Sequence, residues 1–251
     1  MIHTQGLTKT FGALAAVDHL DLDVAPGELF GFLGPNGAGK TTTIRMLSGL
    51  LQPTAGAATV AGYDVLTQTQ EVKAAIGYLP ERPFLYEKLT GREYLDFVGG
   101  LYRVPRPARL AQIERLLDLF DLQEKADALI ESYSHGMRQK IGVAGLLVHS
   151  PKVLFLDEPT NGLDPRSARL VKEILRGLCR KGTTVFMSTH ILEIAEHMCD
   201  RVGIIHQGRL VAAGTLDELR SKTAEASLED IFLQVTGGAE VAELADYLRE
   251  A

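Results

Sequence analysis

The sequence predicts an α/β core with an inserted helical subdomain. Short apolar runs alternate with helical patterns before residue 80 and again after residue 150, as strands alternate with helices in α/β proteins. Between about 81 and 150 there are helical patterns and no convincing strand. We therefore expect one domain over 1–220, which contains the helical subdomain at about 81–150, and a short helical extension over 221–251.

The composition is that of an ordinary globular protein. The 251 residues are 45% hydrophobic and 23% charged, and a chain of this length can bury roughly 70–75% of its unfolded surface. A formal net charge of −6 disfavours a nonspecific coat for DNA. Two cysteines suit a reducing cytosol, and no run approaches the 18 apolar residues that a membrane span needs. We therefore expect a cytosolic chain that could still bind beneath a membrane.

The first 80 residues are expected to hold strands around a glycine-rich loop. Apolar residues alternate over 17–24, which predicts a half-buried strand, and Pro26-Gly27 then turns the chain. Short apolar runs predict further strands, and the segments between them predict helices. The expected strands cover 29–33, 57–60 and 76–79, with helices from the loop to about residue 50 and near 65–75.

Three helices are expected in the inserted region. Thr90 followed by Glu93 is a capping box, which predicts a helix start, and Pro105 and Pro107 should break that helix. Apolar residues at helical spacing predict a second helix, and Ser134 should precede a third. The apolar positions of the second helix are Leu110, Ile113, Leu116, Leu117 and Phe120.

After residue 150, strands and helices alternate again. Asp164-Pro165 reads as an N-cap with proline at the first helical position, and Thr215 with Glu218 forms a second capping box. Beyond Ser221 we expect two short helices joined by residues 236–238. The expected strands cover 153–156, 183–188, 202–205 and 209–213, with a helix over 191–198.

A phosphate-binding loop is the clearest motif. Residues 34–41 match the pattern G-x-x-x-x-G-K-[ST] in full, and they lie between an expected apolar strand and an expected helix. The alternative is an ordinary glycine-rich turn, which the agreement of motif, strand and helix disfavours. Glycines let backbone N–H groups approach phosphate oxygens, and the helix N-terminus attracts the anion. Lys40 should reach the β- and γ-phosphates, and Thr41 should hold Mg²⁺. The residues expected to bind the nucleotide are Gly34, Pro35, Asn36, Gly37, Ala38, Gly39, Lys40, Thr41 and Thr42.

Two adjacent carboxylates follow the apolar run at 153–156. Asp157 is placed to bind Mg²⁺, directly or through water, and Glu158 suits the task of polarising an attacking water. Strands often end in acidic residues without such a role. Here the pair accompanies a complete phosphate loop, so we expect a site that binds and hydrolyses a nucleotide with Mg²⁺ as cofactor.

Three further segments narrow the class of nucleotide enzyme. The sequence lacks the Asn-Lys-x-Asp pattern that recognises the guanine base in GTPases. It carries Ser-His-Gly-Met-Arg-Gln at 134–139, Asn-Gly-Leu-Asp at 161–164 and Ser-Thr-His at 188–190. With these motifs in this order, the chain resembles the ATP-binding cassette family, the ATPase subunits of ABC transporters, over roughly residues 1–220.

Within that family the chain is most similar to the ATPase subunits of ABC-2-type exporters. The features behind this similarity are weaker than the core motifs: the form of the segment at 134–139, together with residues 78–81, 85–91 and 227–232. The resemblance implies a P-loop ATPase core with a mixed sheet and an N-terminal antiparallel β subdomain. It also implies ATP as the nucleotide.

The resemblance implies roles for residues outside the phosphate loop. Phe11 would stack on adenine, the alternative being a core phenylalanine at a strand end. Ser134 and the Gly136 backbone would face the γ-phosphate, the alternative being a plain serine-capped helix. His190 would contact the γ-phosphate, whereas a lone histidine at a strand end is usually structural. Asp164 would lie in the loop that links two sites of a dimer. The expected catalytic residues are therefore Glu158, His190 and Lys40.

The chain departs from the wider family at three positions. Tyr133 and His135 replace a leucine and a glycine of the usual signature, and His135 either tunes closure or is a tolerated variant. Glu81 stands where most relatives have glutamine. We expect Glu81 to join Thr41 and Asp157 as an oxygen ligand of Mg²⁺, the alternative being that it points to solvent.

The resemblance also implies partners. Two cassettes would pair head to tail, and because the chain has one signature and one phosphate loop, the pair requires a second copy or a paralogous subunit. The transport path would belong to separate membrane permease subunits, which place the chain in the cytoplasm on the inner face of the membrane. Docking is expected on the helical region at about 81–150. Its four arginines, at 103, 106, 109 and 115, form either a solvated helix face or a contact for anionic lipid.

The expected function is that of an ATP-hydrolysing subunit that drives transport, most readily export. One alternative is a non-transport ATPase of the same family that works on DNA or ribosomes. Such proteins usually carry two cassettes or a long coiled coil, which 251 residues without heptads do not provide, so we expect no nucleic-acid partner. Another alternative is a module that binds ATP without hydrolysing it. The presence of both Glu158 and His190 disfavours that module.

Overall fold

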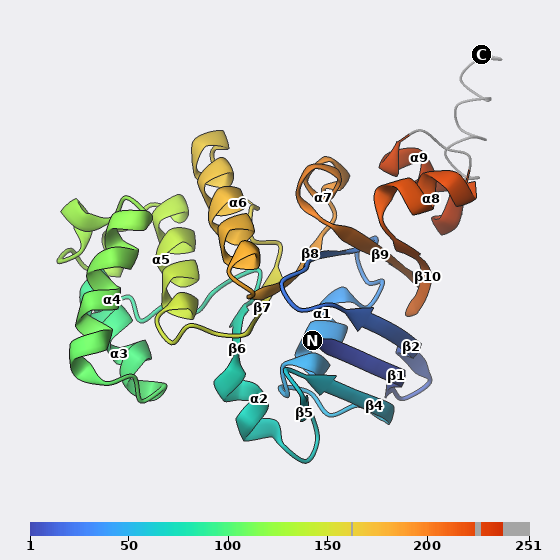
Figure 1. The fold of residues 1–251 in the computed structure, drawn as a ribbon, viewed down its shortest axis with the longest axis horizontal. Coiled ribbons are helices and arrows are strands. Elements are labelled where there is room, and N and C mark those ends of the chain that lie inside the picture. The colour runs from blue at the N-terminus through green and yellow to red at the C-terminus, as the bar shows by residue number, and fades with distance from the viewer. Residues whose placement is uncertain (162, 224–226, 238–251) are drawn as a thin grey trace.

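Two β-sheets and a group of inserted helices form the part of the chain that this computed structural model describes, residues 1–161, 163–223 and 227–237. Helices of the inserted group gather at one end of the molecule, and the last two helices gather at the other (Figure 1). The expected α/β class with an inserted helical subdomain is confirmed. The expected domain limits, 1–220 and 221–251, stay a prediction.

The four-stranded sheet is antiparallel and has the order β2-β1-β4-β5. The N-terminal antiparallel subdomain implied by the resemblance is therefore present. Its first strand was not among the segments that the apolar patterns predicted, because threonines and a glycine interrupt the alternation. Its strands are β1 (Ile2–Phe11), β2 (Leu14–Val24), β4 (Ala55–Val60) and β5 (Tyr63–Asp64).

The six-stranded sheet is mixed and has the order β10-β9-β3-β8-β7-β6. All neighbours pair in parallel except β10, which pairs antiparallel with β9. The strands expected at 29–33 and 76–79 are confirmed to the residue, and the bounds of the other four strands differ from the expected ones by one residue at one or both ends. The strands are β3 (Leu29–Leu33), β6 (Ile76–Leu79), β7 (Val153–Asp157), β8 (Thr184–Thr189), β9 (Arg201–His206) and β10 (Arg209–Gly214).

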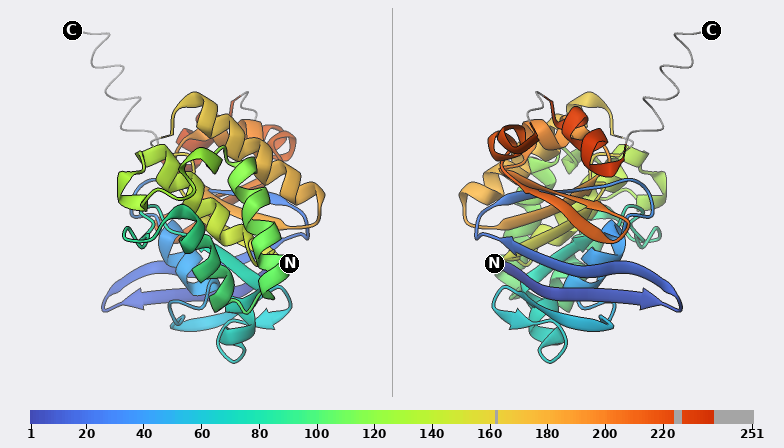
Figure 2. Two further views of the ribbon diagram at one scale, coloured as in Figure 1. Left: turned by 90° about the vertical axis from the view of Figure 1, so that its left-hand side faces the viewer. Right: turned by 90° about the vertical axis from the view of Figure 1, so that its right-hand side faces the viewer.

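Helices cover the sheets on several sides, as the side views show (Figure 2). One helix, α1, contacts β2 and β4 of the antiparallel sheet and β7 of the mixed sheet, so it lies between the two sheets. Of the two short helices expected after Ser221, one is present as α9 and the other lies outside the described residues. These helices are α1 (Lys40–Leu47), α2 (Thr69–Ala75), α6 (Pro165–Arg180), α7 (Leu192–Met198), α8 (Leu216–Thr223) and α9 (Leu228–Thr236).

The inserted subdomain consists of α3 (Gly91–Leu101), α4 (Arg106–Leu119) and α5 (His135–Leu147), with two short 3₁₀ turns between α4 and α5. The capping box is confirmed, because Thr90 Oγ1 accepts from the Glu93 N–H and the Glu93 carboxylate accepts from the Thr90 N–H. The expected break is confirmed, because α3 ends at Leu101 and a new helix begins at Arg106 with Pro105 as its N-cap. Pro107 lies just after the break. It sits in the first turn of α4, where no intrahelical N–H bond is lost.

The expected basic face of this subdomain is smaller than the sequence suggests. The side chain of Arg109 is 16% exposed and ion-pairs with Asp96 at 2.6 Å across the α3–α4 contact. Its stem packs over Gly99, where an added Cβ would lie 2.5 Å from Arg109 Cδ. Arg109 therefore joins two helices and does not contribute to a solvated basic patch.

Four phenylalanines form an aromatic cluster in the core beside the mixed sheet. Phe186 on β8 stacks against Phe30 on β3 with ring centroids 5.5 Å apart, and it contacts Phe32 and Phe155 at 5.2 and 5.7 Å. All four rings are fully buried. Such packing makes the sheet rigid at the strands whose carboxyl ends carry the polar motifs. None of the described helices is both long enough and apolar enough to cross a bilayer.

Candidate active site

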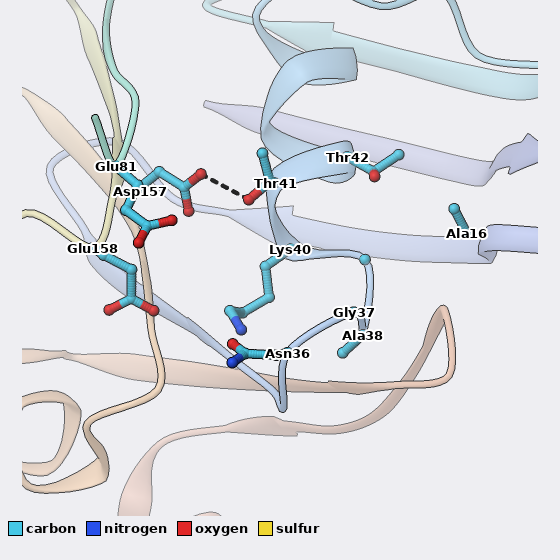
Figure 3. A pocket seen from close by; sticks show the side chains of 11 residues that line it. Ala16, Asn36, Gly37, Ala38, Lys40, Thr41, Thr42, Glu81, Asp157 and Glu158 are labelled. Carbon is cyan, nitrogen blue, oxygen red and sulfur yellow. Dashed lines mark hydrogen bonds between the residues drawn. The ribbon is translucent and has the colours of Figure 1, made fainter. Parts of the chain in front are cut away.

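A pocket of about 170 Å³ lies where β3 and β7 end and α1 begins. Four segments that are far apart in the sequence meet there, and Figure 3 shows three acidic side chains on one side of the pocket with Lys40 facing them. The phosphate loop expected from the sequence forms one wall. The lining residues are Ala16, Asn36, Gly37, Ala38, Gly39, Lys40, Thr41, Thr42, Glu81, Asp157 and Glu158.

The backbone of the loop requires glycine at two positions. Gly39 has φ +114°, and a Cβ there would lie 2.4 Å from the Ala16 carbonyl oxygen. A Cβ on Gly34 would lie 2.4 Å from the Ile205 carbonyl oxygen. No side chain caps α1, so the N–H groups of its first turn remain available to an anion in the pocket. The loop is therefore shaped as a phosphate cradle.

Lys40 is held inside this cradle. Its side chain donates to the carbonyl oxygens of Gly34 at 2.6 Å and Pro35 at 3.2 Å, and the residue is 8% exposed. Burial lowers the pKa of the Lys40 ammonium below its usual value, and the charges of Glu158, Asp157 and Glu81 oppose that shift. The ammonium is thus a partly desolvated cation next to three carboxylates.

Thr41 and Asp157 form the second feature of the pocket. The Thr41 hydroxyl donates to Asp157 Oδ2 at 2.7 Å, drawn as the dashed line in Figure 3. The hydroxyl of Ser188, on β8, donates to the other carboxylate oxygen, Oδ1. Ser188 begins the Ser-Thr-His segment, but no local pattern marks it for a role in the site; the pairing of β7 with β8 brings it to Asp157.

Glu158 comes directly after β7 in an unusual backbone conformation. Its φ is +53°, a left-handed value that few residues other than glycine adopt, and its N–H donates to the Ser188 carbonyl oxygen at 3.1 Å. Its Oε1 lies 2.8 Å from His190 Nδ1. The Glu158 side chain is 9% exposed and that of His190 is 52% exposed, so the histidine covers the carboxylate from the solvent side.

Glu81 is both exposed and part of the pocket lining. Its charge acts on Lys40, which places the carboxylate within electrostatic reach of the phosphate cradle. The two expectations for Glu81, a place at the metal and a place in solvent, are therefore both compatible with its position.

Five of the expected nucleotide-binding residues do not line this pocket: Gly34 and Pro35, whose carbonyl oxygens accept from Lys40, and Phe11, Ser134 and Gly136. Phe11 ends β1 with 51% of its surface exposed and with Lys9 Nζ 5.2 Å above its ring, so the core alternative is wrong. Ser134 caps α5 by accepting from the Met137 N–H at 3.3 Å. Gly136 lies in the first turn of that helix, and a Cβ there would have no neighbour closer than 3.9 Å, the Asp164 carboxylate and Leu163.

Asp164 has the helix-capping role that the sequence predicts. Its Oδ1 accepts from the N–H groups of Arg166 and Ser167, both at 3.0 Å, and these bonds together with the Ser167 side chain lower its pKa. The neighbouring Gly162 of the same expected segment lies outside the described residues.

The donors in the pocket fit Mg²⁺ bound together with a phosphate. Thr41 and Asp157 offer a hydroxyl and a carboxylate side by side. Among the residues that the structure describes there is no group of three or more histidine, cysteine or acidic side chains that could enclose a metal. Mg²⁺ commonly takes only one or two protein oxygens and completes its shell with phosphate and water, so two ligands suffice.

Comparison with known proteins gives a consistent result. Residues 17–161 match the family described as ABC transporter. The chain is 42% identical over 245 residues to the daunorubicin resistance ATP-binding protein DrrA3 of Streptomyces coeruleorubidus, which covers 97% of this chain and 77% of that protein. It is 38% identical to the probable multidrug ABC transporter ATP-binding protein YbhF of Escherichia coli, over 94% of this chain but only 41% of that protein.

A solved structure resembles the fold closely. The structure of an ATP-binding subunit of an ABC transporter superposes with a TM-score of 0.89 at 32% identity, over 94% of this chain and 99% of that one. The similarity therefore extends well beyond the motif-bearing segments.

Proposed function

Since this chain belongs to the ABC transporter family and is an ATP-binding ATPase subunit of that family, we propose that it works in pairs beneath separate membrane permease subunits to drive export. The observation that carries this proposal is the pocket in which the phosphate loop, Thr41, Asp157 and Glu158 meet. Each residue has the chemistry that one part of ATP hydrolysis requires.

Binding of ATP rests on the loop and Lys40. The free N–H groups at the start of α1 and the Lys40 ammonium would surround the β- and γ-phosphates, replacing the carbonyl partners that Lys40 has at 2.6 and 3.2 Å. Thr41 and Asp157 would hold Mg²⁺, which supplies positive charge to the phosphate oxygens. Phe11 is exposed at a strand end, as a ring that stacks on adenine must be.

Hydrolysis is assigned to Glu158 with His190. The oxygens of an ionised carboxylate only accept hydrogen bonds, so when Glu158 acts as a base the 2.8 Å contact would be a bond donated by His190 Nδ1, which orients Glu158. The second oxygen of Glu158 would then accept a proton from the attacking water. His190 is half-exposed, so its remaining ring nitrogen can reach toward the terminal phosphate.

The requirement for two copies rests on the position of the signature. Ser134 and Gly136 do not line the pocket of their own chain, and a Cβ on Gly136 would have no neighbour closer than 3.9 Å. The start of α5 presents free N–H groups beside Gly136, which suits a phosphate that arrives from outside. We therefore assign the signature to the pocket of a second subunit, identical or paralogous.

The permease subunits are assigned to a groove between the inserted helices and the core. This hollow of about 350 Å³ has a mainly apolar lining, with Leu50, Tyr94, Val98, Tyr102 and His149 among its residues. In the segment that leads into α3, Phe84 is 98% exposed, and Tyr86, whose ring contacts Phe97 with centroids 5.0 Å apart, is 58% exposed. These side chains offer apolar surface to a partner. Docking here would place the chain at the inner face of the membrane.

The substrate class is inferred from the relatives, whose names refer to daunorubicin resistance and multidrug transport. We propose that the cargo is an organic antibiotic or drug. The test is to purify the chain with its membrane partner in lipid vesicles and to measure ATP turnover against a panel of such compounds. Stimulation by none of them, with turnover intact, would exclude this cargo class; absence of ATP turnover would exclude the assignment of the pocket.

A further inference from the structure

We propose that Ser188 is a positioning residue that decides which oxygen of Asp157 faces the metal. This inference rests on the proposed ATPase function of the pocket. It concerns a residue outside the pocket lining that acts on the nucleotide only through Asp157 and Glu158.

The geometry is set by the pairing of two parallel strands. Asp157 ends β7, and Ser188 is its register partner on β8. Ser188 is fully buried, and Asp157 is 4% exposed. The Ser188 hydroxyl donates to Asp157 Oδ1, while the Thr41 hydroxyl donates to Oδ2 at 2.7 Å. Both oxygens of the carboxylate thus have a defined and different neighbour.

This division of the two oxygens has a consequence for metal binding. A carboxylate that is held at Oδ1 by a buried donor cannot rotate freely about its Cβ–Cγ bond. Oδ2 therefore stays next to Thr41 at the phosphate loop, where the hydroxyl and the carboxylate oxygen can bind the same ion or its water shell. A partner that holds a metal ligand in this way commonly contributes ten-fold or more to metal affinity.

Ser188 holds the neighbouring Glu158 as well, through its backbone. The Ser188 carbonyl oxygen accepts from the Glu158 N–H at 3.1 Å, at the residue whose φ is +53°. This bond stabilises a strained turn, and it survives any substitution of the serine side chain. Changing the side chain therefore separates the effect on Asp157 from the effect on Glu158.

The experiment measures how nucleotide binding depends on Mg²⁺. A fluorescent ATP analogue that resists hydrolysis is titrated with Mg²⁺ at fixed protein, and its affinity is measured separately in chelator. Ser188→Ala removes the hydroxyl, and Ser188→Cys replaces it with a somewhat larger thiol that is only a weak donor. We expect both variants to need roughly ten-fold more Mg²⁺ for half-maximal binding, while the affinity in chelator stays within about two-fold.

Thr184→Val is the matched control. Thr184 lies on the same strand and the same face as Ser188, and it is also fully buried. Its hydroxyl donates to the Ala25 carbonyl oxygen and accepts from the Gly27 N–H, at the opposite end of the strand from Asp157 and Glu158. We expect this variant to lower the melting temperature and to keep the parent Mg²⁺ midpoint.

The Mg²⁺ midpoints of the parent protein and the variants distinguish a specific effect of the Ser188 hydroxyl from a general effect of strand stability. A folded Ser188→Cys or Ser188→Ala protein with the parent Mg²⁺ midpoint overturns the proposal, as does an equal shift in Thr184→Val, which would mark a general effect of strand stability. If instead the parent protein binds the analogue without any dependence on Mg²⁺, the proposed function of the pocket fails, and Ser188 is not the cause.

Discussion

His190 Nδ1 lies 2.8 Å from Glu158 Oε1, so the residues that follow two neighbouring parallel strands meet beside the phosphate loop. The contact joins the half-exposed histidine to a carboxylate that is almost buried. It leaves one oxygen of Glu158 free on the side of the pocket, where a general base must reach its water.

Glu158→Gln should abolish turnover and keep nucleotide binding. The amide has nearly the same shape and can still contact His190, but it cannot take a proton from water. We expect the rate of ATP hydrolysis to fall by about 10²-fold or more, with ATP affinity within a few-fold of the parent. ATP should then hold the protein as a dimer, which size-exclusion chromatography detects. Parent-rate hydrolysis by this variant would remove Glu158 from the role of base.

Nucleotide binding should weaken as the pH rises toward 10. Burial lowers the pKa of Lys40 in the free protein, and the phosphate charges should raise it in the complex. Between these two pKa values binding takes up a proton, so affinity falls with increasing pH, beginning below the ordinary lysine value of 10.5. Calorimetry in buffers of different ionisation enthalpy measures that proton.

Lys40→Arg is the control for this pH dependence, because a guanidinium stays protonated throughout the range. Its affinity should be lower overall but flat between pH 8 and 10. A pH slope of equal size in the arginine variant would mean that another group takes up the proton. Lys40→Ala should bind the nucleotide roughly ten-fold or more weakly at pH 7.

Gly136→Asp should impair hydrolysis without impairing binding to the monomer. The position has room for a side chain, since an added Cβ would have no neighbour closer than 3.9 Å, so the fold should tolerate the change. In the proposed dimer the new carboxylate would face the triphosphate of the partner and repel it. We expect this variant to lose at least ten-fold in the rate of ATP hydrolysis. In the parent protein, the same dimer model predicts a rate of hydrolysis that rises more than linearly with protein concentration. Gly136→Ala adds a methyl group without charge and should keep most of the activity.

Glu81→Gln should reduce the dependence of ATP binding on Mg²⁺. Glu81 lines the pocket beside Asp157, and its charge opposes a phosphate unless a cation lies between them. Because Glu81 is exposed, solvent screens this repulsion, so we expect metal-free ATP to bind only roughly two- to five-fold more tightly to the glutamine variant. ATP titrations with and without chelator measure the effect. Equal Mg²⁺ dependence in both proteins would place Glu81 away from the metal and limit its role to the permease interface.

Features that depend on a few consecutive residues were predictable from the sequence. The strand at 29–33, the phosphate loop and the capping box at Thr90 are encoded by neighbours within about eight residues, and the structure has each of them where it was expected. Hydrophobic period and backbone preference act over that distance. For the same reason β1 was missed, since pairing with other strands outweighed the local pattern.

The sequence by itself determined which chemical groups the site would contain: a phosphate cradle, a lysine, a threonine and two carboxylates. Only the tertiary structure decided how they are held. Ser188 reaches Asp157, 31 positions earlier in the sequence, because β7 and β8 pair in parallel, and Arg109 turns inward because Asp96 lies on the facing helix. Such contacts depend on strand register and helix packing, which arise from the whole core and leave no signal in the local pattern of residues.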